Sequence, residues 1–251
     1  MVKKRKIKIF GVGGGATNII NRMIKNGLTG AEIWVLNTDK QMLKMGHTDN
    51  MILLGVKTTE GLGTGGNYKI GECAAKESQQ EIKKALEGAD MVFITAGLGG
   101  GTGTGAPPVI AKVAKELGIL TIALVTKPFS WEGNKRQLTA EKGIEKLREC
   151  VDAIIVVPNN KMLDSVKKQA SLTDAFKIID EVLLRIIQSI LDIITIPGFI
   201  NIEIADIVNA IQGLGTALIG VGTAHGDNRA VKAAKEAIRL IPMENSKGGN
   251  C

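Results

Sequence analysis

Short runs of continuously apolar residues alternate along this chain with longer segments in which apolar residues recur every three or four positions. The apolar runs cover residues 7–10, 32–36, 91–95, 120–125 and 153–157. Continuous apolar runs are typical of strands buried on both faces, and the segments between them have the period of amphipathic helices. The pattern predicts an α/β fold, a Rossmann-like parallel sheet with helices on both faces.

The longest helical pattern covers residues 173–195 and ends before Pro197 and Gly198. At 1.5 Å per residue it predicts a central helix of roughly 33 Å. Beyond it we expect a loop at 201–206, a short helix near 207–212, one strand at 216–221 and a last helix at 227–240. One strand is too few for a self-standing sheet. We therefore expect an incomplete C-terminal α+β subdomain, and three parts with the bounds 1–172, 173–196 and 197–251.

Six glycines and two threonines lie between residues 96 and 105, directly after the apolar run at 91–95 and before a helix that we expect to begin at Ala106. Backbone N–H groups in such a loop can surround an anion, and a helix N-terminus adds partial positive charge. A flexible linker would not separate a buried strand from an apolar helix so directly. The chain lacks the lysine-bearing P-loop sequence, so any phosphate would be held by glycine backbone.

Two further glycine-rich loops cover residues 11–16 and 61–66. The first alone matches Gly-x-Gly-x-x-Ala, and Asp39 at the end of the next strand could bind a ribose hydroxyl. A dinucleotide-dependent oxidoreductase is therefore one interpretation. A dinucleotide site does not need the other two glycine loops, at 61–66 and 97–105. These loops favour a nucleoside triphosphate as the ligand.

Composition narrows the function classes. The chain of 251 residues carries a net charge of +7, but only 3% of its residues are aromatic, which disfavours base-stacking recognition of nucleic acid. Its three cysteines lack metal-ligand spacing, and its most apolar stretch contains charged residues and Pro197. We expect a cytoplasmic protein with no nucleic-acid partner, no protein-bound metal and no direct membrane insertion.

Several motifs occur in an order that resembles the tubulin/FtsZ family of GTPases over nearly the whole chain. They cover residues 13–18, 37–39, 61–67, 99–105, 127–133 with Arg136, 158–159, 174–176 and 201–206. Within the family the loops resemble bacterial FtsZ rather than tubulin, whose loops are longer. The resemblance implies that the chain binds GTP and GDP, with Mg²⁺ held through water and phosphates.

The same resemblance implies a role for each nucleotide-binding residue. Phosphates would be held by Gly14, Gly15, Ala16, Thr17, Asn18, Gly65, Gly66, Gly100, Gly101, Thr102, Gly103 and Thr104, with Asp39 near the hydrated Mg²⁺. Glu132 and Arg136 would meet the ribose and phosphate, although their spacing alone favours a helical ion pair. Phe176 would stack on the base, and Asn159 and Asp180 would read guanine; alone, Asp180 is typical of a solvated helix charge.

The family's catalytic loop resembles residues 201–206, where Asn201, Glu203 and Asp206 would hold an attacking water. The resemblance implies that this loop acts on the nucleotide of the neighbouring subunit in a head-to-tail filament. Without it, Asp206 would be interpreted as a helix cap and Glu203 as a solvated charge. Glu203 departs from the usual aspartate by one methylene, so a non-catalytic GTP-binding assembly regulator is an alternative.

The resemblance further implies a role in cell division, in a ring at midcell. Members of the family carry more strands after the last expected helix, and then a disordered tail whose end binds membrane tethers. We expect both to be absent from this chain, so its own copies are the expected partner and other division proteins are further candidates.

Overall fold

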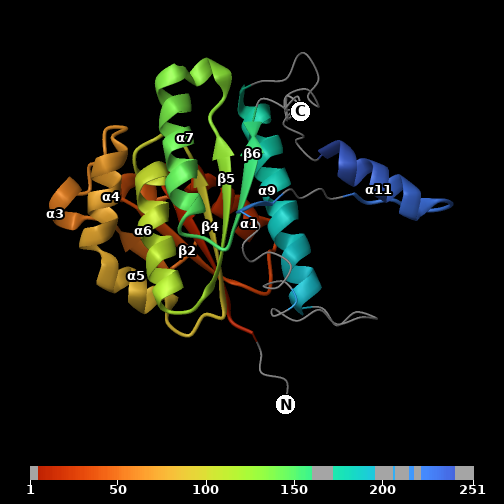
Figure 1. Cartoon of the computed structure of the whole chain (residues 1–251), viewed down its shortest axis with the longest axis horizontal. Helices are drawn as coiled ribbons and strands as arrows, with labels where there is room; N and C mark the ends of the chain where they lie inside the picture. Colours follow the sequence, from red (N-terminus) through yellow and green to blue (C-terminus); the bar gives the residue numbers. More distant parts are fainter. Residues whose placement is uncertain (1–4, 160–171, 196–205, 207–214, 218–221, 241–251) are drawn as a thin grey trace, which may run out of the picture. The chain divides into compact units, whose positions relative to one another are not determined.

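The computed structural model describes residues 5–159, 172–195, 206, 215–217 and 222–240 (Figure 1). Their contacts divide the chain into two units, residues 1–217 and 218–251. The first unit contains every strand of the described residues. The second contains one described helix, α11 (Arg229–Leu240), whose Val231 and Ile238 side chains are exposed.

The strands form a single parallel sheet in the order β3-β2-β1-β4-β5-β6-β7. Their bounds are β1 Ile7–Val12, β2 Glu32–Asn37, β3 Met51–Leu53, β4 Met91–Gly97, β5 Leu120–Lys127, β6 Ala153–Pro158 and β7 Gly215–Ala217. The five predicted apolar runs are β1, β2, β4, β5 and β6. The α/β fold with a parallel sheet is therefore confirmed.

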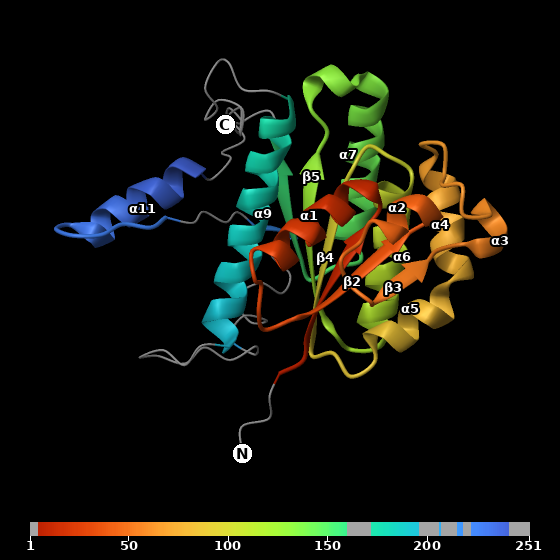
Figure 2. The ribbon, with the colours of Figure 1, turned by 180° about the vertical axis from the view of Figure 1, so that it is seen from behind.

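Helices cover both faces of this sheet. Those of the first unit are α1 Gly14–Lys25, α2 Lys40–Lys44, α3 Val56–Thr59, α4 Tyr68–Glu77, α5 Gln79–Leu86, α6 Thr102–Glu116, η1 Ser130–Glu132, α7 Asn134–Arg148 and α9 Leu172–Thr195. Figure 1 shows α6 and α7 in front of the sheet, and Figure 2 shows α1 and α9 on the opposite face. The described part of the predicted central helix is α9.

A core cluster fills the space between the sheet and helices α4 to α7. Phe10, Ile94 and Ile110 are fully buried there, together with Ile82 and Leu86 of α5. Burying a side chain of this size stabilises the fold by about 1.5–3 kcal/mol. The cluster fixes α6, and with it the start of that helix, against the strand ends.

Helix α6 begins at Thr102, and the expected start at Ala106 is wrong. Its first backbone bond runs from Gly105 N–H to the Gly101 carbonyl at 2.9 Å. A Cβ at Gly103 would lie 2.4 Å from the Gly97 oxygen, and one at Gly105 would lie 2.0 Å from the Tyr68 oxygen. The glycines therefore allow the first turn to pack on β4 and α4. In the sequence alone, such a glycine-rich turn resembles a loop.

The segment after α9 differs from the expected arrangement in one respect. The expected strand at 216–221 is described only as β7, which joins the main sheet beside β6. The short helix expected near 207–212 and residues 218–221 lie outside the described residues. The three-part division at residues 172 and 196 stays a prediction. None of the described helices combines the length and hydropathy needed to cross a membrane.

Candidate functional site

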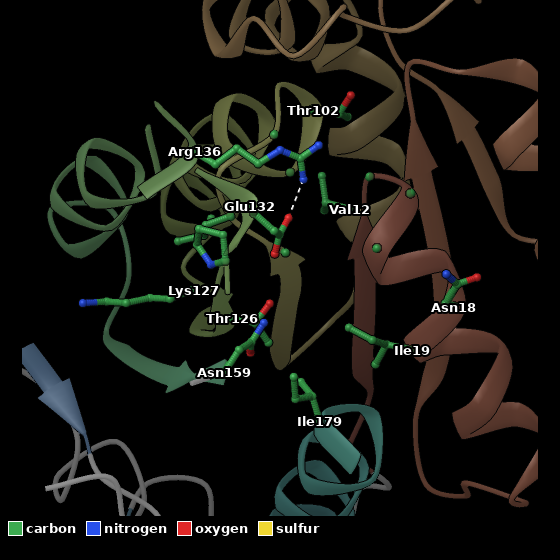
Figure 3. Close-up of a pocket in the computed structure, with 18 of the residues that line it drawn as sticks. Val12, Asn18, Ile19, Thr102, Thr126, Lys127, Glu132, Arg136, Asn159 and Ile179 are labelled. Atoms are coloured by element: carbon green, nitrogen blue, oxygen red, sulfur yellow. Dashed lines mark hydrogen bonds and ion pairs between the residues drawn. The ribbon is translucent and has the colours of Figure 1, made fainter. Parts of the chain in front are cut away.

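A cavity of about 440 Å³ opens at the carboxyl ends of the strands (Figure 3). It is lined by Val12 of β1, Gly97 of β4, Lys127 of β5 and Asn159, which follows β6. The strand order reverses between β1 and β4, and α1 and α6 leave these strands toward opposite faces. A crevice at such a switch point is the usual ligand site of an open α/β sheet.

One end of the cavity is formed by the first turns of two helices. Helix α1 begins after Gly13 and α6 after Gly101, and neither has an acidic residue in its first turn. Both starts line the cavity, so unpaired backbone N–H groups and two partial positive charges converge there. This end has the chemistry of an anion site, and we call it the anion end.

The loop at residues 61–66 reaches the anion end through Thr64. A Cβ at Gly101 would lie 2.0 Å from the Thr64 hydroxyl oxygen, so these two residues are in close contact. Gly65 and Gly66 adopt φ values of 58° and 78°, which glycine accepts readily, and they are not part of the cavity wall. Their predicted contact with a phosphate remains untested.

Four other predicted residues, Ala16, Thr17, Asp39 and Thr104, are not part of the cavity wall. Thr17 Oγ1 donates to the Gly13 carbonyl at 3.3 Å, and the Thr104 hydroxyl accepts from Gly99 N–H at 2.9 Å. Asp39 Oδ1 accepts from two backbone N–H groups and thereby caps α2. Ala16 is buried. The Thr17 and Thr104 bonds hold backbone at the cavity, whereas the roles of Ala16 and Asp39 toward phosphate and Mg²⁺ stay predictions.

The opposite end, which we call the base end, is made of side chains. Asn159 is 5% exposed, and its Oδ1 has no hydrogen-bond partner among the described residues. Phe176 of α9 contacts Phe129 edge-on, with ring centroids 5.1 Å apart, and Phe129 stacks on Trp131. A buried, unpaired acceptor costs free energy unless a ligand satisfies it. Asn159 therefore points to a ligand that donates hydrogen bonds.

Asp180 of α9 completes the base end. Its side chain is 13% exposed, and its Oδ2 lies 3.4 Å from Arg22 Nε of α1. Burial raises the pKa of Asp180 to about 6, although the Arg22 guanidinium opposes this rise. Asp180 is therefore a partly buried carboxylate at a cavity wall, unlike the solvated helix charge that its sequence position alone suggests.

Glu132 and Arg136 form the ion pair that their spacing predicts, at 2.6 Å, and both line the cavity (Figure 3). The second oxygen of Glu132 accepts from Phe129 N–H at 2.8 Å. The pair therefore holds η1 and the start of α7 together. It also places a carboxylate and a guanidinium between the two ends of the cavity.

The structure brings twelve of the eighteen predicted nucleotide-binding residues to one cavity: Gly14, Gly15, Asn18, Gly100, Gly101, Thr102, Gly103, Glu132, Arg136, Asn159, Phe176 and Asp180. Of the predicted catalytic residues, Asn201 and Glu203 lie outside the described residues, and Asp206 is exposed. Ile19 and Ile179 also line the cavity but were not predicted as site residues. Both lie on apolar helix faces, where sequence alone indicates core.

Comparison with known proteins agrees with this geometry. Residues 6–167 match the Tubulin/FtsZ family, GTPase domain. An empty FtsZ dimer from M. jannaschii is 44% identical to this chain, with a TM-score of 0.89 over 94% of this chain and 69% of the other. A point mutant of FtsZ from M. jannaschii is also 44% identical, with a TM-score of 0.89 over 95% and 72%.

A GTPγS-bound protofilament of CetZ2 from Haloferax volcanii is 24% identical to this chain, with a TM-score of 0.77 over 88% of this chain and 67% of the other. At that identity the likeness shows the fold alone. The family match over residues 6–167 and the 44% identity to FtsZ go further. The chain belongs to the tubulin/FtsZ family of GTPases.

Proposed function

We propose that this chain binds GTP and GDP in the cavity and hydrolyses GTP within a head-to-tail polymer of its own copies. The observation that carries the proposal is the unlike character of the cavity's two ends. The anion end offers backbone N–H donors at two helix starts, and the base end offers two acceptors, Asn159 Oδ1 and the Asp180 carboxylate. A nucleotide has the matching order of groups, with phosphates at one end and a base at the other.

The acceptors at the base end favour guanine over adenine. Guanine presents a ring N–H and an amino group on one edge, and Asp180 would accept from both. Adenine presents a ring nitrogen without a proton there, and that lone pair would face the carboxylate. A site that leaves buried polar groups unpaired discriminates strongly between ligands. Phe176 would cover one face of the base.

Hydrolysis is proposed to require a second copy of the chain. Asp206 is exposed and is not part of the cavity wall, which supports a role toward the nucleotide of a neighbouring subunit. With Asn201 and Glu203 of the same loop it would hold and polarise the attacking water. The relative from M. jannaschii is described as an FtsZ dimer, which supports self-association. A cytoplasmic role in cell division at midcell belongs to the same proposal.

Mg²⁺ belongs to this proposal as a water- and phosphate-bound ion. The part of the chain that the structure describes contains no group of three or more His, Cys, Asp or Glu residues that could hold a metal. The Thr102 hydroxyl lies at the anion end, 2.7 Å from that of Thr38, and such oxygen donors suit Mg²⁺. When bound, the ion would neutralise charge on the phosphates.

The first test is competition between nucleotides. The purified chain should bind GDP about 100-fold or more tightly than ADP, because adenine leaves the Asp180 carboxylate unpaired. Isothermal titration calorimetry measures both affinities, and the nucleotide that copurifies gives an independent readout by mass. Retention of NAD instead of a guanine nucleotide would favour the oxidoreductase interpretation.

The second test concerns catalysis between subunits. GTP turnover per subunit should rise steeply with protein concentration, because one copy would supply Asp206 to the nucleotide of the next. Phosphate release and light scattering, measured on the same samples, check this. Turnover that stays constant on dilution of an assembling protein would contradict it.

Two variants probe the catalytic loop itself. Asp206→Ala should abolish turnover and leave GDP affinity unchanged. Glu203→Asp should raise turnover, because a carboxylate misplaced by about 1 Å can cost about 100-fold in rate. If neither variant changes phosphate release in a folded, GTP-binding protein, the non-catalytic assembly regulator becomes the better description.

A further inference from the structure

A polar junction joins α1 to α9 directly beside the base end. Arg22 Nε lies 3.4 Å from Asp180 Oδ2, and Arg22 Nη1 lies 3.9 Å from a Glu181 oxygen. Arg22 Nη1 also donates to the Lys177 carbonyl at 3.5 Å. One guanidinium therefore contacts three residues of α9, at positions 177, 180 and 181, which lie about one helical turn apart on one side of that helix. None of the sequence motifs points to Arg22.

The carboxylate that Arg22 contacts is the one at the cavity wall. Arg22 faces a second cavity, of about 690 Å³, that shares Asn18, Phe176 and Asp180 with the nucleotide cavity. Asp180 therefore stands between the two cavities, with Arg22 on one side and the base end on the other. Its Oδ2 faces Arg22, and a carboxylate has enough lone pairs to serve a base as well.

We infer that Arg22 is a positioning residue for base recognition: it keeps the Asp180 carboxylate ionised and oriented so that it can accept the hydrogen bonds of guanine. The inference rests on the proposed function of the cavity. Recognition of a ring N–H and an amino group requires an acceptor with no proton of its own. A protonated Asp180 would place its own O–H donor opposite the N–H donors of guanine.

Burial and charge act on Asp180 in opposite directions. Burial raises the pKa of Asp180, the Arg22 guanidinium lowers it and the charge of Glu181 raises it, and the resulting pKa is about 6. Other charged or titratable groups line the two cavities around it: Lys25, His47, Lys127, Glu132, Arg136 and Lys177. Arg22 is the cation in contact with the carboxylate among the described residues. Its removal should therefore move the pKa of Asp180 toward neutral pH.

The experiment is a double-mutant cycle read as GDP affinity from pH 6 to pH 9. Arg22→Gln should weaken GDP binding by about 5- to 10-fold at pH 6.5, because fewer Asp180 side chains are ionised there, and this deficit should shrink toward pH 9. Arg22→Gln should have little further effect in the Asp180→Asn background. The cycle cancels the titration of the GDP phosphate, which all variants share.

Three further variants serve as controls. Arg22→Lys keeps the charge and should restore most of the affinity at pH 6.5. Arg22→Met keeps the apolar stem and replaces Arg22→Gln if that variant does not fold. Arg185→Gln removes an exposed cation from the same helix, α9, and should leave GDP affinity unchanged at every pH.

The outcomes separate this inference from the proposed function. A deficit that is equal at pH 6.5 and pH 9, or equal with and without Asp180, would overturn the inference and assign Arg22 a structural role only. Wild-type protein that binds no GDP, or binds it independently of Asp180, would instead overturn the proposed function. An NMR titration of the Asp180 carboxyl carbon, assigned with Asp180→Asn, measures the expected rise in its pKa directly.

Discussion

At the anion end of the cavity the wall is backbone from two helix starts, whereas at the base end it consists of side chains from α9 and the residue after β6. The anion end depends on residues without a side chain, because Gly101, Gly103 and Gly105 leave room for close packing. The base end depends on what side chains present, as Asn159 and Asp180 do. Substitutions at the anion end should therefore act mainly through packing, and substitutions at the base end mainly through hydrogen bonding and charge.

The substitution with the largest expected effect disrupts the packing at the anion end. Gly105→Ala should destabilise the fold by about 3 kcal/mol or more, because its Cβ would lie 2.0 Å from a backbone oxygen of α4 that cannot easily move. Denaturant unfolding measures this. Gly100→Ala is the matched control, since a Cβ there meets nothing within 4 Å, and it should change stability by less than about 0.5 kcal/mol. Equal losses in both variants would contradict the comparison.

At the base end, the Asp180 carboxylate should favour GDP binding and at the same time lower the stability of the unliganded protein. Asp180→Asn should weaken GDP binding by about 1–3 kcal/mol, the usual cost of leaving a charged hydrogen bond unmade. The same variant should stabilise the unliganded protein by about 1–3 kcal/mol at pH 7, because it removes a buried charge. Calorimetry with and without GDP measures both effects.

The gain in stability should depend on pH with a defined sign. The pKa of Asp180 in the folded protein, about 6, lies above its ordinary value of 3.8, so its ionised form disfavours the fold. The gain of Asp180→Asn should therefore be complete above pH 7, shrink as the pH falls through 6, and vanish below about pH 4. A gain that is constant over this range would show that Asp180 is not a strained charge.

The smallest expected effect, on GDP affinity, tests the role of the aromatic cluster of Phe129, Trp131 and Phe176. Phe176→Leu should weaken GDP binding about fivefold, because it removes about 1 kcal/mol of ring contact. Phe176 is 43% exposed, so stability should change by less than about 0.5 kcal/mol. Fluorescent GDP titration measures the affinity. A loss of stability larger than the loss of binding would show that Phe176 serves the fold.

The two ends also differ in how far sequence could predict them. The anion end lies in two local runs, 11–16 and 97–105, whose composition alone indicates backbone contact with an anion. The start of α6 was missed because Gly103 and Gly105 are read as loop residues until their packing partners are known. The strand β3 was missed because three residues are too few to show a period.

The base end could be predicted only through the family resemblance. Asn159, Phe176 and Asp180 are ordinary residues in their local contexts, and only the packing of α9 brings them to β6 and η1. Arg22 and Ile19 could not be found at all, because each belongs to a normal amphipathic helix. Tertiary contacts, which no local pattern encodes, decide which of these side chains meet a ligand.

The order of the two ends along the chain has a consequence for synthesis on the ribosome. The strands and helices of the anion end are complete once Glu116 has emerged, whereas the base end awaits Asp180, 64 residues later (180 minus 116). At about 5–20 residues per second this interval lasts on the order of several seconds. On the function proposed above, a nascent chain would thus meet the phosphates of any cellular nucleotide before it can tell guanine from adenine. In the growing chain, selectivity therefore follows phosphate binding.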